Sequence, residues 1–132
     1  MAGELKRVWY PVMEDIIDAN ITVLGVGGDK HPHRLLLRAE AIQTVIDRMI
    51  KVETKGLAYQ AAWLMKELVK LHAFDGANHR TAYLVAKIFL RRNGKRLRIA
   101  RLEDAYLFIS RLETKTVEQI QDWIEHGEGE GP

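Results

Sequence analysis

Apolar residues recur at steps of three and four along most of this chain, a spacing that commits it to amphipathic helices. Residues 55–71 show the pattern most clearly, with Leu57, Leu64 and Leu68 on one face and charged side chains on the other. The spacing and its breaks predict helices at about 11–24, 35–51, 55–71, 78–93, 102–112 and 116–126. The strand signal is confined to 97–99 and part of a glycine-rich loop at 25–33. The expected fold class is therefore all-α, a compact bundle of about six helices.

Composition limits what such a bundle can be. The 132 residues, 47% hydrophobic and 29% charged, fit a single domain over 1–132, with a frayed tail expected at 126–132. The chain has no cysteine, which excludes disulfides, thiol catalysis and cysteine-bound zinc. No apolar run approaches the roughly 20 residues of a membrane helix, and the first ten residues contain charges in place of an apolar signal core. We therefore expect a cytoplasmic protein with no membrane partner.

An interrupted segment between two predicted helices, residues 72–82, concentrates the residues suited to chemistry. A central helix starts near Asn78, a residue type that often caps helix N-termini, and its stretch 82–90 is apolar all round except for Lys87. Gly76 and Ala77 are small, so the backbone can bend there and approach a ligand closely. The first-turn N–H groups and the helix dipole favour an anion, and Arg80 adds a charged fork suited to phosphate oxygens. The segment therefore predicts a phosphate cradle.

Two titratable side chains of the same segment could act on a bound phosphate. His72 can take a proton from a hydroxyl nucleophile near neutral pH. Asp75 could hold magnesium, which binds through one or two carboxylates together with substrate phosphates. This combination suggests phosphoryl or nucleotidyl transfer. Each residue alone has an ordinary structural explanation, as a helix cap, a turn or a surface charge, so the hypothesis depends on their combination.

The segment resembles the signature of the Fic/Doc family. The matching residues are His72, Phe74, Ala77, Asn78 and Arg80. The continuation at 80–82 and the stretch 89–94 resemble the Doc (death-on-curing) toxin branch in particular, as does an alanine before the asparagine. Upstream, an Asp-Ala-Asn helix end at 18–20, a glycine loop and an Arg-x-Glu-Ala helix start at 38–41 follow in the family's order.

The resemblance implies a helical bundle with the motif loop between two central helices, and a role for each motif residue. His72 would deprotonate a Ser, Thr or Tyr hydroxyl of a protein substrate, and Phe74 would anchor the loop in the core. The loop 25–33 would be the flap that positions the target. The donor would be ATP or another nucleoside triphosphate, with Mg²⁺. The residues implied to bind the nucleotide and its phosphates are Gly76, Ala77, Asn78, His79 and Arg80.

Three positions depart from the family's pattern. The family's metal-binding acid directly precedes the small residue before asparagine, but Gly76 occupies that position and Asp75 stands one earlier, which puts magnesium use in question. His79 follows Asn78, where AMP-transferring Fic enzymes usually have glycine and Doc has lysine. A large side chain there favours a nucleotide that presents its γ-phosphate to the histidine. Tyr83 replaces a second arginine typical of Fic, which again indicates Doc.

Three functions follow from the resemblance. The first is a Doc-like toxin that transfers a phosphoryl group to a protein hydroxyl, for example on a translation factor. An antitoxin protein would neutralise it, because the family's internal inhibitory motif is absent: Thr114 and Glu118 have the spacing, but Gln119 follows. The second is a protein AMP-transferase (AMPylator) of the Fic type. The third is a catalytically degenerate domain that acts as a binding module, which Gly76 supports.

Two further features carry less weight. His31 and His33 could join His72 or His79 around a metal, but nothing in their spacing defines a site. The basic stretch 91–101 could neutralise nucleic-acid phosphates. Basic residues near a helix end are, however, usually solvated and favoured by the helix dipole, and the net charge is only +2, so nucleic acid is not the expected partner.

Overall fold

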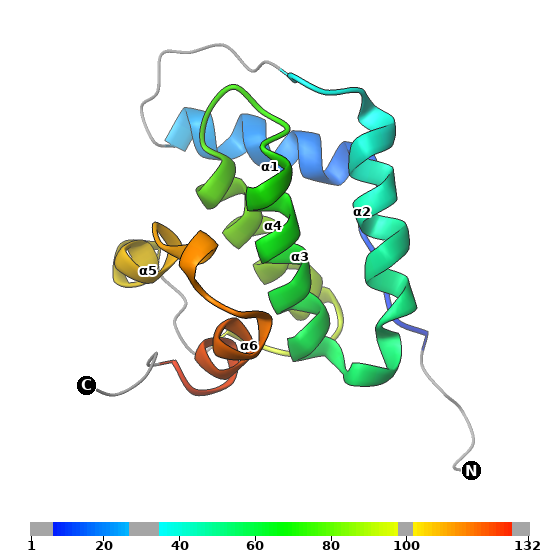
Figure 1. Ribbon diagram of the computed structural model, residues 1–132, viewed down its shortest axis with the longest axis vertical. Helices are drawn as coiled ribbons and strands as arrows, with labels where there is room; N and C mark the ends of the chain where they lie inside the picture. Colours follow the sequence, from blue (N-terminus) through cyan, green and yellow to red (C-terminus); the bar gives the residue numbers. More distant parts are fainter. Residues whose placement is uncertain (1–6, 27–34, 98–101, 128–132) are drawn as a thin grey trace.

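The computed structural model describes residues 7–26, 35–97 and 102–127 and confirms the all-α fold class (Figure 1). Its elements are α1 (Met13–Val26), α2 (Ala39–Lys51), η1 (Glu53–Lys55), α3 (Leu57–Leu71), α4 (Asn78–Arg92), α5 (Leu102–Ile109), η2 (Leu112–Thr114) and α6 (Val117–His126). In this part of the chain the only β pairing is an isolated antiparallel bridge between Leu35 and Phe74. None of its helices is both long and apolar enough to span a membrane.

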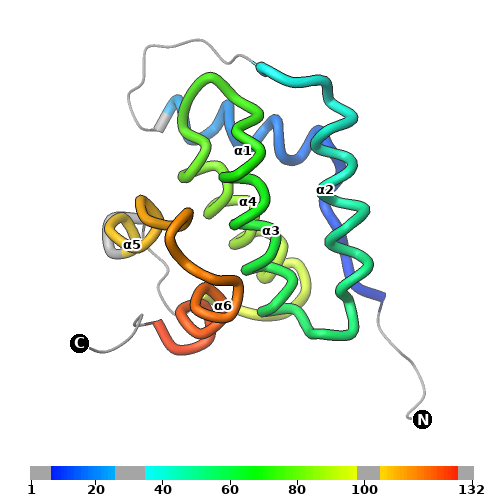
Figure 2. The backbone as a smooth tube through the Cα atoms, in the orientation of Figure 1, coloured from blue at the N-terminus to red at the C-terminus, as the bar shows by residue number. Residues whose placement is uncertain are grey.

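α3 and α4 form the centre of the bundle, joined at one end by the short loop 72–77 (Figures 1 and 2). α2 and α6 pack against α3, and α1 packs against α4 beside the loop. Fully buried alanines on both central helices, Ala61 and Ala62 in α3 and Ala82 and Ala86 in α4, allow close packing within the core. As predicted, the stretch 82–90 of α4 is apolar except for Lys87, and none of its residues is exposed. Ala73 and Phe74 of the motif loop belong to the same core.

Tertiary pairing changes the predicted start of α2, and α1 runs two residues further than predicted. α2 begins at Ala39 rather than at residue 35 because the preceding segment pairs with the motif loop. The Leu36 N–H donates to the Ala73 carbonyl at 2.7 Å, next to the bridge from Leu35. α1 continues past the predicted end at 24, so Gly25 is helical and does not belong to the glycine loop. The rest of that loop, including His31 and His33, lies outside the described residues.

The C-terminal boundaries are set by local capping. α5 ends at Ile109, before the predicted 112, and the chain turns into η2. α6 starts with a capping box in which the Thr116 hydroxyl accepts the Gln119 N–H while the Gln119 side chain accepts the Thr116 N–H. Gly127, with φ 85°, ends the helix and donates its N–H to the Trp123 carbonyl. The first two residues of the predicted frayed tail, 126 and 127, form this helix end, and residues 128–132 lie outside the described residues, so the fraying stays a prediction.

The strand candidate at 97–99 is only partly described. Leu97 is buried and belongs to no strand. Residues 98–101, which include part of the basic stretch, lie outside the described residues.

Candidate active site

Two left-handed residues shape the loop between α3 and α4. His72 caps the C-terminus of α3 with φ 51° and ψ 52°, and Ala77 precedes α4 with φ 62° and ψ 30°. Such dihedrals are uncommon for residues that carry a Cβ. Of the two small residues at which the backbone was expected to bend, Ala77 is the one with a left-handed conformation. Gly76 has no positive φ, and a Cβ placed on it would meet no atom within 4 Å.

The Asn78 side chain closes this loop on itself. Asn78 is the first residue of α4 rather than its N-cap, and it is only 7% exposed. Its Oδ1 accepts the Phe74 N–H at 3.1 Å, and its Nδ2 donates to the Phe74 carbonyl at 2.9 Å. The Phe74 ring lies in the core. Asn78 therefore satisfies both polar groups of a buried backbone segment and fixes the path of the loop.

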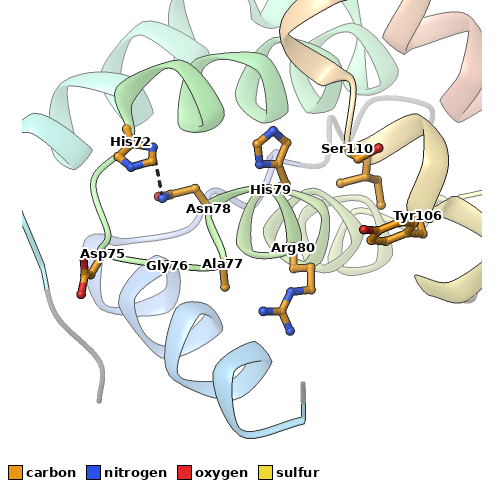
Figure 3. Close-up of a pocket in the computed structure, with 10 residues that line it drawn as sticks. His72, Asp75, Gly76, Ala77, Asn78, His79, Arg80, Tyr106 and Ser110 are labelled. Carbon is orange, nitrogen blue, oxygen red and sulfur yellow. Dashed lines mark hydrogen bonds between the residues drawn. The ribbon is translucent and has the colours of Figure 1, made fainter. Parts of the chain in front are cut away.

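His72 is exposed and takes its orientation from the same asparagine. Its Nδ1 lies 3.3 Å from Nδ2 of Asn78 (Figure 3). The asparagine amide nitrogen can only donate, so this contact favours the neutral tautomer whose proton is on Nε2. Because the ring is exposed, it can exchange that proton with water. A base role at Nε2 therefore requires a change of tautomer, which solvent makes accessible.

Arg80 is half-buried and connects α4 to α1. Its Nη1 donates to the Val23 carbonyl at 3.1 Å, in the last turn of α1, where the helix dipole favours a cation. Arg80 also lines the pocket beside the loop. It can therefore hold α1 in place and present positive charge to an anion.

His79 contacts a segment that follows α5. Its Nε2 lies 2.9 Å from Oε2 of Glu113 in η2. The hydrogen bond from His79, assisted by the backbone around Glu113, lowers the pKa of the Glu113 carboxyl below 4.5. The imidazole is thus tied to one wall of the site.

These side chains meet in a cavity of about 320 Å³, at the lower end of the usual range for ligand sites. Its lining consists of His72, Asp75, Gly76, Ala77, Asn78, His79, Arg80, Tyr106, Ile109 and Ser110. In Figure 3, His72 and His79 lie on one side of the loop and Arg80 on the other. Every motif residue predicted to contact nucleotide thus lines one cavity, together with α5 residues.

The donor set does not form a magnesium site by itself. Asp75 is the one carboxylate among the described lining residues, and Figure 3 shows it pointing away from His72. Gly76 has no side chain to contribute, and the described residues contain no cluster of three or more His, Cys, Asp or Glu placed for a metal. Arg80 and the backbone N–H groups remain as the positive groups of the site.

Several residues that shape the site had no predicted role there: Asn20 was noted only within the Asp-Ala-Asn stretch at 18–20, and Tyr106 and Glu113 were not noted. Asn20 in α1 donates to the Gly76 carbonyl and to the Thr81 hydroxyl. The sequence offered one signal, because Asn20 is an amide within the apolar stripe of a predicted helix. The burial of the apolar residues around it shows that this stripe faces the core. Glu113 and Tyr106 have no such signal, because they reach the loop only through the packing of α5 and η2.

A sequence model of the Fic/DOC family matches residues 15–90. The match runs from α1 to the end of α4 and contains the whole motif loop, but it stops before α5, η2 and α6. A search of the curated proteins gives no match.

Proposed function

The chain belongs to the Fic/DOC family, whose members transfer nucleotide-derived groups to proteins, and we propose that this one is a Doc-like protein phosphotransferase. The observation that supports this proposal most is that one cavity brings together His72, the start of α4 and Arg80. A triphosphate held at that helix start places a phosphorus atom beside an exposed imidazole.

The proposed step uses ATP and a Ser, Thr or Tyr hydroxyl of the target protein. His72 takes the hydroxyl proton as the hydroxyl oxygen bonds to the γ-phosphorus. The bond between that phosphorus and the β–γ bridging oxygen breaks, and ADP leaves. Arg80 and the N–H groups at the start of α4 offset the charge on the transferred group. Magnesium, when bound to the nucleotide, would neutralise phosphate charge further.

His79 supports γ- over α-phosphoryl attack. Glu113 holds its imidazole at the cavity wall, so the space that a glycine would leave for an extended triphosphate is filled. Tyr106, 64% exposed, and Ile109 offer an apolar wall on α5 for the nucleotide base. A reversed nucleotide can then present its terminal phosphate to His72.

The Doc-like motif is also the basis for a proposed biological role. The protein would inhibit growth by modifying a translation factor, and an antitoxin would neutralise it. Gly76 favours one alternative, a domain that binds nucleotide or a partner without transfer, because the family's acid is missing there.

The test is incubation with α-labelled and γ-labelled ATP in parallel, with cell lysate and then with purified translation factors. We expect protein-bound label from γ-labelled ATP only, and its loss in His72→Ala. His79→Gly should open the other path and increase label from α-labelled ATP. Protein-bound α-label with the unmodified chain would establish AMP transfer instead. Nucleotide binding without any transfer to these targets would support the binding module.

A further inference from the structure

A buried amide outside the motif loop contacts both that loop and the first turn of α4. Asn20 in α1 is 0% exposed. Its Nδ2 donates to the Gly76 carbonyl at 2.9 Å and to Oγ1 of Thr81 at 3.0 Å. A buried amide is costly unless it is hydrogen-bonded. This one makes its bonds across the interface between α1 and the start of α4, next to Gly76, which lines the cavity.

Thr81 continues the network to the next peptide group. Its hydroxyl donates to the Ala77 carbonyl at 2.7 Å, and its backbone N–H donates to the same oxygen at 2.9 Å. Asn20 and Thr81 therefore hold the carbonyl groups on both sides of the left-handed Ala77, the Gly76 carbonyl through Asn20 and the Ala77 carbonyl through Thr81.

Holding a carbonyl also sets the direction of an N–H. A trans peptide group is planar, so its carbonyl and its N–H point in opposite directions. With the Gly76 and Ala77 carbonyls turned toward the bundle, the N–H groups of Ala77 and Asn78 point away from it, where these residues line the cavity. Successive N–H groups beside a left-handed residue at a helix start form a concave anion site.

We propose that Asn20 is a positioning residue that sets the peptide donors of the phosphate cradle, acting through Gly76 and Thr81. The proposal rests on the proposed function, since it assigns Asn20 to the cradle in which the nucleotide phosphates bind. Asn20 does not touch the phosphates. It selects the orientation of the peptide groups whose N–H groups would bind the phosphates. These peptide groups flank Ala77, where the backbone is strained.

The experiment measures tripolyphosphate binding by calorimetry for the full chain and for Asn20→Ala, with ATP as a second probe. We expect Asn20→Ala to weaken both by at least about tenfold, because the freed peptide groups no longer hold one orientation. The matched control is Ile16→Val, which alters another fully buried α1 side chain. It should leave both affinities unchanged. In an active preparation, Asn20→Ala should raise KM for ATP more than it lowers kcat.

A second pair keeps the test decisive if Asn20→Ala does not fold. Thr81→Val removes the hydroxyl that joins Asn20 to Ala77, whereas Thr81→Ser retains it. Thr81→Val should weaken tripolyphosphate binding and Thr81→Ser should restore it. On titration, the amide resonances of Ala77 and Asn78 should shift in the wild type.

The outcomes separate this proposal from the proposed function. Equal tripolyphosphate affinity in wild type, Asn20→Ala and Thr81→Val overturns the role of Asn20 and leaves the phosphotransferase proposal standing. Absence of tripolyphosphate and ATP binding in the wild type overturns both. Binding that depends on Asn20 in a protein that transfers no group supports the cradle and contradicts only the catalytic assignment.

Discussion

Nε2 of His79, in the first turn of α4, lies 2.9 Å from Oε2 of Glu113 in η2. The two side chains are 35% and 54% exposed, so solvent screens their attraction and the pair adds little stability. Its effect is geometric, because it joins the motif helix to a segment beyond the stretch that the family model matches. The imidazole next to the proposed phosphate cradle is therefore held by a residue that the motif does not contain.

This pair predicts a small loss of stability in acid. The folded pKa of Glu113 lies below 4.5, so its contribution is present above that unfolded value and is lost as pH falls through the folded pKa. In urea unfolding, Glu113→Gln should be slightly less stable than wild type at about pH 6, and the difference should shrink as the pH falls below 4.5. Glu125→Gln, at an exposed glutamate on α6, is the control. An undiminished difference in acid would contradict the assignment.

Loss of the proposed base should remove transfer without unfolding the protein. His72→Ala should reduce transfer roughly 10²–10⁴-fold, the usual cost of losing a general base. Because His72 has a positive φ, His72→Asn is the better-folded companion, since asparagine tolerates that backbone. His126→Ala, at an exposed histidine in α6, should have no effect. Activity of His72→Asn within about threefold of wild type would exclude the base role.

The Asn78 side chain should contribute strongly to the stability of the protein, because it hydrogen-bonds the backbone of the loop. Asn78→Ala would leave the buried Phe74 N–H and carbonyl without their partner and should destabilise the protein by about 2–4 kcal/mol. Asn78→Asp keeps an acceptor for the N–H but sets a buried carboxylate oxygen against the Phe74 carbonyl, so at neutral pH it should destabilise the protein at least as much. Urea unfolding measures both. A free energy of unfolding for Asn78→Ala within about 0.5 kcal/mol of wild type would show that the loop holds without this side chain.

Restoring an acid at the family position should create a magnesium response. A Cβ at Gly76 has open space and the residue has no positive φ, so Gly76→Asp should fold normally. We expect magnesium to increase its ATP affinity more than it does in wild type, as measured by calorimetry with and without chelator. Gly76→Ala controls for the backbone. A strong response in wild type that Asp75→Asn removes would show that Asp75 already serves as the ligand.

Tyr10 should make the protein sensitive to alkali. Its hydroxyl donates to Oε2 of Glu53 at 2.6 Å and accepts from Gln60, and burial, aided by the Glu53 contact, raises the pKa of Tyr10 to about 12. Its stabilisation is complete below the unfolded pKa of 10.0 and is lost as pH rises through about 12. Tyr10→Phe should reduce the fall of the free energy of unfolding with rising pH, as measured in unfolding experiments. Tyr106→Phe, at an exposed tyrosine, should not.

Helix boundaries show where local pattern stops being sufficient. The start of α6 was predictable within a residue because Thr116 and Gln119 cap it through bonds inside one short segment. The start of α2 was not, since Leu35 and Leu36 have the spacing of helix residues but pair with Ala73 and Phe74 of the motif loop. Periodicity shows which face of a segment is apolar. It cannot show that a distant segment will hydrogen-bond the backbone groups that a helix would otherwise use.

The sequence by itself determined the helical class and the apolar character of residues 82–90, because both follow from local spacing, and the family resemblance implied that the motif lies between two central helices. The tertiary structure alone decided the contacts that set up the site: Asn20 with Gly76 and Thr81, Arg80 with Val23, and His79 with Glu113. These partners stand 34 to 61 residues apart. Their distances depend on how α1, α4 and η2 pack, and packing is a property of the whole core.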